Sequence, residues 1–205
     1  MTMITLYDFP LSGHAHRVRL MLSLLNLDYE LVQVDLTRGE QKTPDFLQLN
    51  PFGVVPVLVD GDLVLRESTA ILTYLARTYG PQWLPIEPVA MAEVQTWLAT
   101  ANKDVVTGPG AARLVTVFNA PLDHAALISK SHELLTTIDK HLVDRQWLAL
   151  EHPTIADVAA YSYIAHAPEG HVSLDGYPNI RRWITSIEAL PGFVGMPRTE
   201  VPAAA

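Results

Sequence analysis

The sequence has 205 residues, a length that suits one large domain or two small ones. Its 14 Lys and Arg residues against 22 Asp and Glu residues give a net charge of −8 at pH 7, without the basic run that nucleic-acid or anionic-membrane binding requires. Hydrophobic residues make up 49% of the chain, which excludes intrinsic disorder, and the lack of cysteine excludes disulfides, cysteine-ligated zinc and a catalytic thiol on the protein.

The sequence contains no pattern typical of export or membrane insertion. The first positive charge is Arg17, which falls inside a predicted helix and not in a basic leader segment. The richest apolar stretch, residues 20–27, is much shorter than the roughly 18 residues of a membrane span. We therefore expect a cytoplasmic protein.

Residues 1–79 alternate strand-like and helix-like segments. The patterns predict strands at 3–7 and 29–34, helices around 18–25 and at 44–49, a hairpin of 57–59 and 63–65 closed by an Asp60-Gly61 turn, and a helix over 67–79. The order β-α-β-α-β-β-α predicts a mixed sheet with helices.

The second half of the chain shows only helical patterns. Three prolines, at 81, 85 and 88, are typical of a stiff linker over residues 80–88. Helices are predicted over 89–106, 122–142, 154–167 and 178–190, with a helix break at Gly108-Pro109-Gly110. Thr154-Ile155-Ala156-Asp157 predicts a capping box at a helix start. We expect an α/β domain over 1–79 and an all-α domain over 89–205.

Several catalytic patterns are incomplete. His14 and His16 fall on opposite sides of a predicted helix without a carboxylate pair, so no metal site is expected. His132-Glu133 lacks the second histidine of a zincin motif, because Thr136 stands in its place. Gly108-Pro109-Gly110 lacks the last glycine of a dinucleotide-binding loop, and neither a nucleophile elbow nor a phosphate-binding loop is present.

Three positions remain as candidates for chemistry, each with a plainer alternative. Ser12 stands where the first strand passes into a helix, so its hydroxyl could donate to an anion or simply cap the helix. Ser68 opens a later helix and allows the same two interpretations. Val55-Pro56 could form a cis bond that turns the Val55 backbone toward a peptide-like ligand, or Pro56 could be an ordinary proline at a strand entry.

Together, three motifs resemble the glutathione S-transferase family. They are Tyr7 to Arg19 with Ser12, Asn50 to Leu58 with Val55-Pro56, and Glu67-Ser68-Thr69-Ala70-Ile71. The resemblance covers the whole chain and is to the serine-type (theta-, zeta- and delta-like) cytosolic class of bacteria. It implies a thioredoxin-like glutathione-binding domain over 1–79 and a helical domain over 89–205, whose capping box Thr154-Asp157 matches.

The resemblance also implies roles for the candidate residues. Ser12 would be the catalytic hydroxyl that hydrogen-bonds the glutathione sulfur, and it is preferred over Tyr7, which lies within the strand pattern. Val55 would pair through its backbone with the cysteinyl part of glutathione, with Pro56 holding the bond in cis. Glu67 and Ser68 would hold the γ-glutamyl ammonium and carboxylate.

The remainder of the site is less defined by the resemblance. Gln41 stands where related classes often carry histidine, so either Gln41 or Lys42 could hold the glycyl carboxylate, and Val54 replaces a residue that is polar in many relatives. Local positive charge for the anionic tripeptide could come from Lys42, Arg17 or Arg66, or these could be solvated surface. The second-substrate pocket has four candidates, which could equally be core or surface residues: Leu11, Asn102, Thr107 and Arg113.

The expected function is activation of the glutathione thiol as a thiolate that attacks a small hydrophobic electrophile. Glutathione is then the co-substrate, no metal is required, and the resemblance implies a homodimer whose helical domains supply the hydrophobic pocket. Conjugation, peroxide reduction and isomerisation all begin with this thiolate and stay open. Glutathionyl transfer through a protein cysteine is excluded by composition. The alternative is a non-catalytic binding or regulatory module on the same fold.

Overall fold

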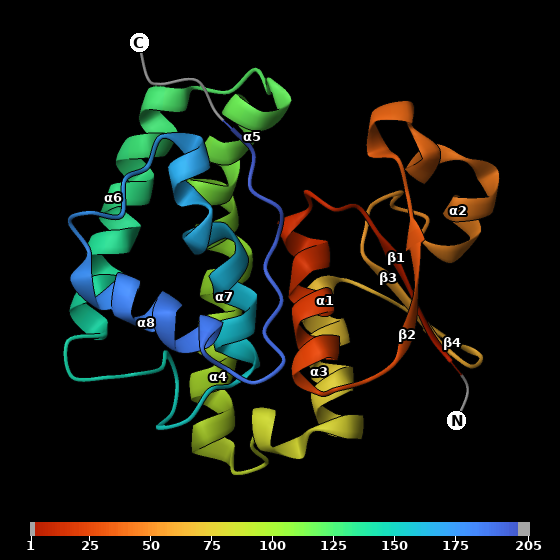
Figure 1. The fold of residues 1–205 in the computed structure, drawn as a ribbon, viewed down its shortest axis with the longest axis horizontal. Helices are drawn as coiled ribbons and strands as arrows, with labels where there is room; N and C mark the ends of the chain where they lie inside the picture. Colours follow the sequence, from red (N-terminus) through yellow and green to blue (C-terminus); the bar gives the residue numbers. More distant parts are fainter. Residues whose placement is uncertain (1–2, 201–205) are drawn as a thin grey trace.

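The computed structural model describes residues 3–200, which form a small mixed sheet with helices and a second half built from helices (Figure 1). The strands β1 (Ile4–Asp8), β2 (Tyr29–Gln33), β3 (Val57–Asp60) and β4 (Leu63–Arg66) lie in the order β2-β1-β3-β4. β1 runs parallel to β2 and antiparallel to β3, and β3 runs antiparallel to β4. The parallel pair requires a crossover, which α1 (Gly13–Leu24) supplies. The predicted α/β half is therefore confirmed.

The predicted hairpin forms, but its turn is shifted by one residue. Asp60 pairs with Leu63 as the last rung of the β3–β4 ladder, so the two-residue loop is Gly61-Asp62 and not Asp60-Gly61. Gly61 adopts φ +60°, which a two-residue hairpin loop requires and glycine accepts without strain. The Asp60 carboxylate accepts hydrogen bonds from the hydroxyls of Tyr74 and Tyr79, which fixes it on the strand side of the turn.

Two helices of the first half lie between the sheet and the helical half. These are α1 and α3 (Ser68–Tyr79), while α2 (Pro44–Leu49) lies on the other side of the sheet (Figure 1). The sequence predicts an apolar stripe of Val18, Met21, Leu22 and Leu25 along α1, of which the first three are buried and Leu25 is partly buried against the core. Both α1 and α3 contact α7 (Ile155–Ala165). One continuous apolar core therefore joins the two halves.

The helical half confirms the all-α prediction. Its helices are α4 (Pro88–Thr100), η4 (Ala101–Gly110), α5 (Ala111–Phe118), α6 (His124–His141), α7 and α8 (Pro178–Glu188). Of the short 3-10 turns, η1 (Leu36–Arg38), η2 (Glu40–Lys42) and η3 (Pro81–Trp83) precede α4, and η5 (Ala167–Gly170) lies within the helical half. No helix within residues 3–200 combines the length and apolar character that crossing a membrane would need.

The helix break predicted at Gly108-Pro109-Gly110 is wrong. The chain passes through this segment as a π-helix, η4, and continues directly into α5. Proline lacks the N–H of a normal helical bond and crowds the preceding turn, and a widened turn accommodates both effects. At Gly110 a Cβ atom would come within 3.3 Å of the Tyr163 ring, so the small residue lets η4 approach α7 closely.

The predicted capping box is confirmed at the start of α7. The Asp157 carboxylate accepts from the backbone N–H and the hydroxyl of Thr154, and the Thr154 hydroxyl in turn accepts from Ala156 N. Asp157 also accepts from Leu148 N and Trp183 Nε1, each at 2.9 Å. This buried carboxylate thus ties the start of α7 to the preceding loop and to α8.

Candidate functional site

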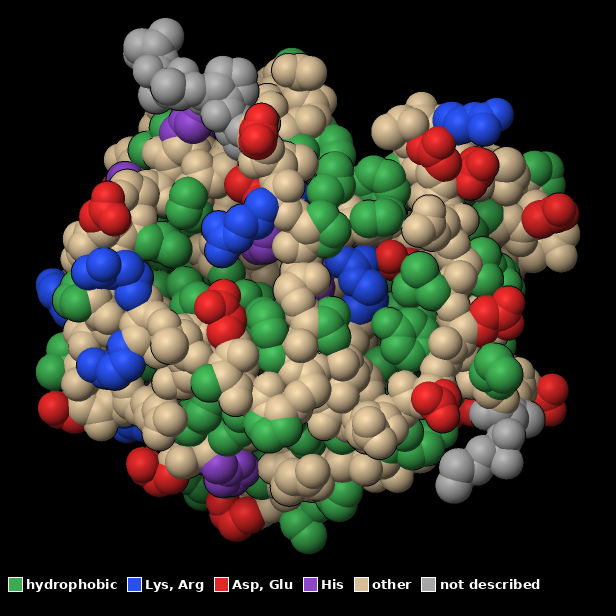
Figure 2. Space-filling view, in the orientation of Figure 1, with side chains coloured by type: hydrophobic (Ala, Val, Ile, Leu, Met, Phe, Trp, Pro, Cys, Tyr) green, Lys and Arg blue, Asp and Glu red, His purple; other side chains and the backbone are tan. Residues whose placement is uncertain are grey.

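A cavity of about 550 Å³ lies between the two halves of the molecule. Its helical wall consists of Val106, Gly110, Arg113, Leu114, Phe118 and Tyr163. The opposite wall comes from the loop after β1, the first turn of α1, and the segments around residues 36–41 and 53–55. Figure 2 shows the molecule hollowed between α5 and the lobe that carries α2, with hydrophobic side chains on both sides. The cavity suits an apolar ligand beside a few polar groups.

Ser12 lines this cavity as the N-cap of α1. Its Oγ accepts from Ala15 N at 3.2 Å, so the capping interpretation is confirmed. That bond uses one lone pair of the hydroxyl oxygen and leaves the O–H proton free to donate. Within residues 3–200 no acceptor takes this proton. Capping and donation to a ligand are therefore compatible at Ser12.

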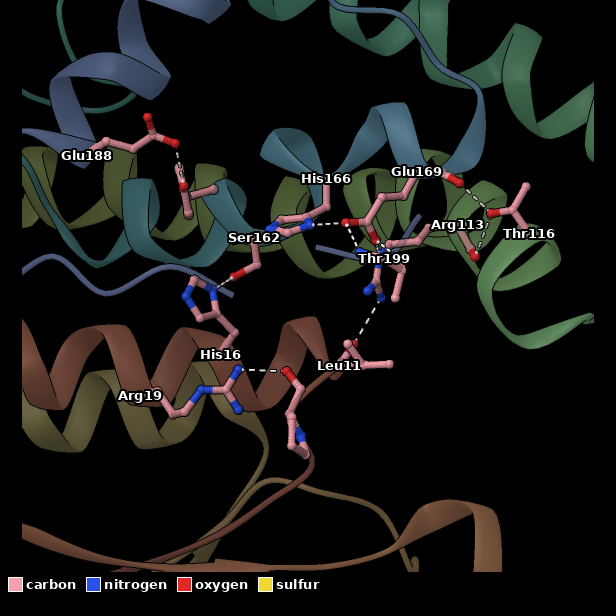
Figure 3. A network of polar contacts seen from close by, with 12 residues as sticks. Leu11, His16, Arg19, Arg113, Thr116, Ser162, His166, Glu169, Glu188 and Thr199 are labelled. Carbon is pink, nitrogen blue, oxygen red and sulfur yellow. Dashed lines mark hydrogen bonds and ion pairs between the residues drawn. The ribbon is translucent and has the colours of Figure 1, made fainter. Parts of the chain in front are cut away.

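The loop that carries Ser12 is held by two arginines. Arg19 donates to Pro10 O at 2.9 Å and pairs with the buried carboxylate of Asp8. Arg113, from α5, donates through Nη1 to Leu11 O at 2.9 Å (Figure 3). Charged donors to backbone carbonyls are stronger than neutral ones, so the approach to Ser12 is fixed from both halves of the chain.

Arg113 is anchored within a buried ionic cluster (Figure 3). Its Nε lies 2.5 Å from Glu169, which also accepts from His166 Nδ1 at 2.7 Å and from the Thr199 hydroxyl at 2.9 Å. Burial alone would raise the pKa of Glu169, but the bonds to His166 and Arg113 hold it below its usual value. Glu169 is therefore ionised at neutral pH and compensates the charge of Arg113, whose side chain is only 1% exposed.

Arg17 forms a second buried cationic position, beside Ser68. Its guanidinium is 0% exposed and donates to Ser68 Oγ at 3.1 Å, Asn102 Oδ1 at 2.9 Å and Ala101 O at 3.0 Å. No carboxylate within residues 3–200 pairs with it, and burial lowers its pKa to about 10. Arg17 is thus a buried charge and not the solvated surface residue that was one of its two sequence-based interpretations.

The chain passes from β4 into α3 through Glu67, which has an unusual backbone conformation. Glu67 has φ +69°, a left-handed value that costs free energy for a residue with a side chain, and its side chain makes no capping bond to α3. The first amides of α3 are therefore left without a side-chain cap next to Ser68. This places a carboxylate and a helix N-terminus side by side.

The segment around Val55 forms another part of the wall. The Val55-Pro56 peptide bond is cis. Val55 lines the cavity, and within the described residues its backbone N–H and C=O have no hydrogen-bond partner. Gln41 also lines the cavity, whereas Lys42 lies outside it and donates to the carbonyls of Phe52 at 3.1 Å and Gly53 at 2.9 Å.

The structure brings together only some of the residues predicted for the second-substrate pocket. Leu11 and Arg113 line the cavity. Asn102 does not, because its side chain bonds to Arg17 and Thr69, and Thr107 does not, because its hydroxyl accepts from Lys130 on α6. Tyr7 packs edge-on against Phe46 and is also not part of the cavity wall.

Sequence reasoning missed several cavity residues. Tyr163 and Phe118 lie more than 100 residues from Ser12 in the chain, and nothing local in the sequence marks them. His14 was considered only as a metal ligand, although its place two residues after Ser12, in the first turn of α1, was a usable signal. His14 and His16 point to different partners, and residues 3–200 contain no group of His, Asp and Glu that could hold a metal ion.

Comparison with known proteins identifies relatives along the whole chain. Family models described as "Glutathione S-transferase, N-terminal domain" and "Glutathione S-transferase, C-terminal domain" match residues 2–77 and 122–191. Glutathione S-transferase 3 of Zea mays is 36% identical over 94% of this chain and 92% of its own length. The crystal structure of a glutathione S-transferase from Pseudomonas fluorescens matches with a TM-score of 0.90 at 32% identity, over 95% of this chain and 99% of that one. A glutathione transferase homologue from Drosophila mojavensis, solved with bound glutathione, matches with a TM-score of 0.85 at 27% identity, over 93% and 90%.

Proposed function

The chain belongs to the glutathione S-transferase family and is a glutathione transferase, and we propose that it ionises the thiol of glutathione at Ser12 and directs the thiolate at a small hydrophobic electrophile. The observation that carries this proposal is the free proton of the Ser12 hydroxyl, which stands at the N-terminus of a twelve-residue helix and on the wall of the cavity.

Ser12 acts on the sulfur by favouring its anionic form. A free thiol has a pKa near about 8.5, so only a few per cent is thiolate at neutral pH. A hydroxyl donor and the positive end of the α1 dipole both stabilise the anion. Each unit by which the pKa falls corresponds to about 1.4 kcal/mol of differential stabilisation. A modest shift is sufficient, because further lowering reduces the nucleophilicity of the thiolate.

Three groups are proposed to hold the tripeptide, of which Val55 and Gln41 line the cavity while Glu67 and Ser68 lie outside its lining. The unpaired backbone N–H and C=O of Val55, next to Pro56, suit the extended cysteinyl part. The Glu67 carboxylate suits the γ-glutamyl ammonium, while the Ser68 hydroxyl and the uncapped α3 amides suit the neighbouring carboxylate. Gln41 on the cavity wall, or Lys42 beside it, would hold the glycyl carboxylate. The Drosophila mojavensis homologue, which was solved with bound glutathione, supports glutathione as the ligand but does not bear on the individual residues.

The apolar part of the cavity is proposed to hold the electrophile. Leu114, Phe118 and Val106 face the loop at Leu11, and together they favour a small hydrophobic molecule over a charged one. We propose conjugation to an electrophilic carbon as the reaction, in which the sulfur–carbon bond forms within this space. The homodimer and the cytoplasmic location stay predictions.

The proposal is tested by the thiol pKa of bound glutathione, followed by ultraviolet difference titration in the wild type and in Ser12→Ala. We expect a wild-type pKa well below that of free glutathione and a higher value in the variant, with glutathione still bound. Binding with an unshifted pKa would contradict the catalytic role and indicate a binding module. A shift that survives Ser12→Ala would move the role to the backbone amides at the start of α1, since Tyr7 lies off the cavity wall.

A further inference from the structure

His14 occupies a position on the cavity wall that the proposed chemistry has not yet used. It is the second residue of α1, two positions after Ser12. Its ring packs edge-on against Tyr163, with centroids 5.3 Å apart and planes at 78°. The imidazole is therefore held in one orientation between the first turn of α1 and the opposite wall of the cavity.

The hydrogen bonds of His14 determine which ring nitrogen carries the proton. Nδ1 lies 3.1 Å from Arg17 Nη1 and 3.3 Å from Ser68 Oγ. A guanidinium can only donate, so Nδ1 must be the acceptor. The neutral ring then carries its proton on Nε2. Arg17 is held in place by its own bonds to Asn102 and Ala101, so this tautomer is built into the buried side of the site.

His14 also stays neutral at physiological pH. Burial and the charge of Arg17 lower its pKa to about 3. The ring is consequently neither a cation nor a base for the thiol, whose proton must leave to solvent. What it offers is a single N–H donor of fixed direction, and no acceptor within residues 3–200 takes the Nε2 proton.

Several other polar side chains of the cavity already have partners. The Thr37 hydroxyl donates to Asp35 at 2.5 Å, and Gln41 Nε2 donates to Leu36 O. Arg113 is bonded to Glu169 through Nε and to Leu11 through Nη1, and its buried Nη2 has no partner within residues 3–200. Ser12 is assigned to the sulfur. His14 is thus a side-chain donor of fixed direction on the same cavity wall as Ser12, in mostly apolar surroundings where such a donor has its largest effect.

We propose that His14 is a catalytic residue for electrophiles whose reaction places charge on oxygen, and specifically for α,β-unsaturated carbonyl compounds. This inference rests on the proposed function. The thiolate adds to the β-carbon, a sulfur–carbon bond forms, and the carbon–carbon π pair moves to give an enolate. The Nε2–H of His14 donates a hydrogen bond to the enolate oxygen without transferring its proton, as neutral imidazole does toward carbonyl oxygens in other enzymes. A proton from water then reaches the α-carbon and balances the proton that the thiol released.

The experiment compares two electrophiles in the wild type and two variants. 2-Nonenal forms an enolate, whereas 1-iodobutane releases iodide, a poor hydrogen-bond acceptor. His14→Phe keeps an aromatic ring and removes both nitrogens. His14→Gln is the matched variant, because its amide oxygen can accept from Arg17 while its N–H₂ donates to the cavity. For His14→Phe we expect kcat/KM with 2-nonenal to fall about tenfold or more, and kcat/KM with 1-iodobutane to change less than about twofold. His14→Gln should retain most of the 2-nonenal activity.

The thiol pKa of bound glutathione separates this inference from the proposed function. It should be the same in wild type and both variants, because Ser12 and not His14 serves the sulfur. An equal loss with both electrophiles, together with a raised thiol pKa, would overturn the proposal and assign His14 to the thiolate. Wild-type turnover of 1-iodobutane without 2-nonenal would also overturn it. An unshifted thiol pKa in the wild type would instead refute the proposed function itself.

Discussion

Two helix N-termini in this protein carry the same local chemistry and differ in what is left over. At α7, the Thr154 hydroxyl accepts from Ala156 N and donates to Asp157, and the whole group is buried. At α1, the Ser12 hydroxyl accepts from Ala15 N and has no acceptor for its own proton, and it faces a cavity. A saturated cap holds a fold together, whereas an unsaturated cap beside a cavity is able to serve a ligand.

The residues around the two caps also differ in whether all their hydrogen-bonding groups are paired. Asp157 accepts four hydrogen bonds, from Leu148, Trp183 and two groups of Thr154, so it satisfies donors from three segments. Near Ser12, the loop carbonyls of Pro10 and Leu11 are satisfied by arginines, and the Ser12 hydroxyl, whose proton has no acceptor within residues 3–200, belongs to a residue that lines the cavity. The difference predicts that substitutions at α7 reduce stability, and that substitutions at α1 reduce activity.

The largest effect is expected for Asp157→Ala. The substitution leaves several buried donors unpaired, and losses of this kind cost about 3–5 kcal/mol in the free energy of unfolding. Urea denaturation measures the loss. Glutathione affinity of the fraction that stays folded should be unchanged. A loss below about 1 kcal/mol in the free energy of unfolding would show that the α7 cap is not needed for stability, and it would contradict the contrast between the α7 and α1 caps.

Ser12→Ala should give the converse result. We expect kcat/KM for conjugation to fall tenfold or more, equivalent to about 1.4 kcal/mol or more in the transition state. The free energy of unfolding should fall by only about 0.5–1 kcal/mol, because a single, partly buried cap bond is lost. Ser12→Thr is the matched control, since it keeps both the cap and the hydroxyl. If Ser12→Ala lost stability and kept its activity, Ser12 would be a structural cap like Thr154.

A smaller effect is expected for Thr154→Val, which keeps the side-chain shape and removes the hydroxyl. Ala156 N and Asp157 each lose one partner, so the free energy of unfolding should fall by about 1–2 kcal/mol. The thiol pKa of bound glutathione should not change, because α7 places no polar cap in the cavity. A shifted thiol pKa in this variant would show that the two helix starts are coupled and not separate.

The contrast between the caps also shows what the sequence alone could and could not predict. The capping box of Thr154 and Asp157 could be predicted because both partners lie within four residues. The pairing of β3 with β4 could be predicted for the same reason, since only a short turn separates the two strands. The π-helix at Pro109 was missed, since glycine and proline usually end a helix and only the contact of Gly110 with Tyr163 makes its continuation useful.

The residues of the candidate site also differ in whether a local motif or a contact across the fold determines their position. Ser12, Val55 and Ser68 lie in short motifs next to strand ends, and a resemblance could identify them. Asn102 and Thr107 were placed by their position on a helix, and the direction of their side chains depends on Arg17 and Lys130, which the sequence does not place. The state of His14 likewise depends on contacts across the fold, with Ser68 lying 54 residues away in the chain.

The smallest effect is expected for His16, whose hydrogen bond to Ser162 joins α1 to α7. His16 of α1 donates through Nε2 to Val194 O at 2.9 Å. It accepts through Nδ1 from the Ser162 hydroxyl of α7, also at 2.9 Å (Figure 3). Burial lowers its pKa from 6.5 to about 3. Below pH 6.5 the unfolded chain therefore binds a proton that the folded chain refuses, so acid favours unfolding. This group should remove about 1 kcal/mol of stability between pH 6.5 and about 5.5.

His16→Gln tests this contribution, because its amide can still donate to Val194 O and does not titrate. The variant should be less stable than the wild type at pH 7, and the difference should shrink by about 1 kcal/mol between pH 6.5 and about 5.5. His14, whose pKa is also lowered to about 3, titrates in both proteins and cancels in the difference. Parallel pH profiles of the two proteins would mean that His16 accepts a proton in the folded state, and that the bond to α7 opens more easily than its burial implies.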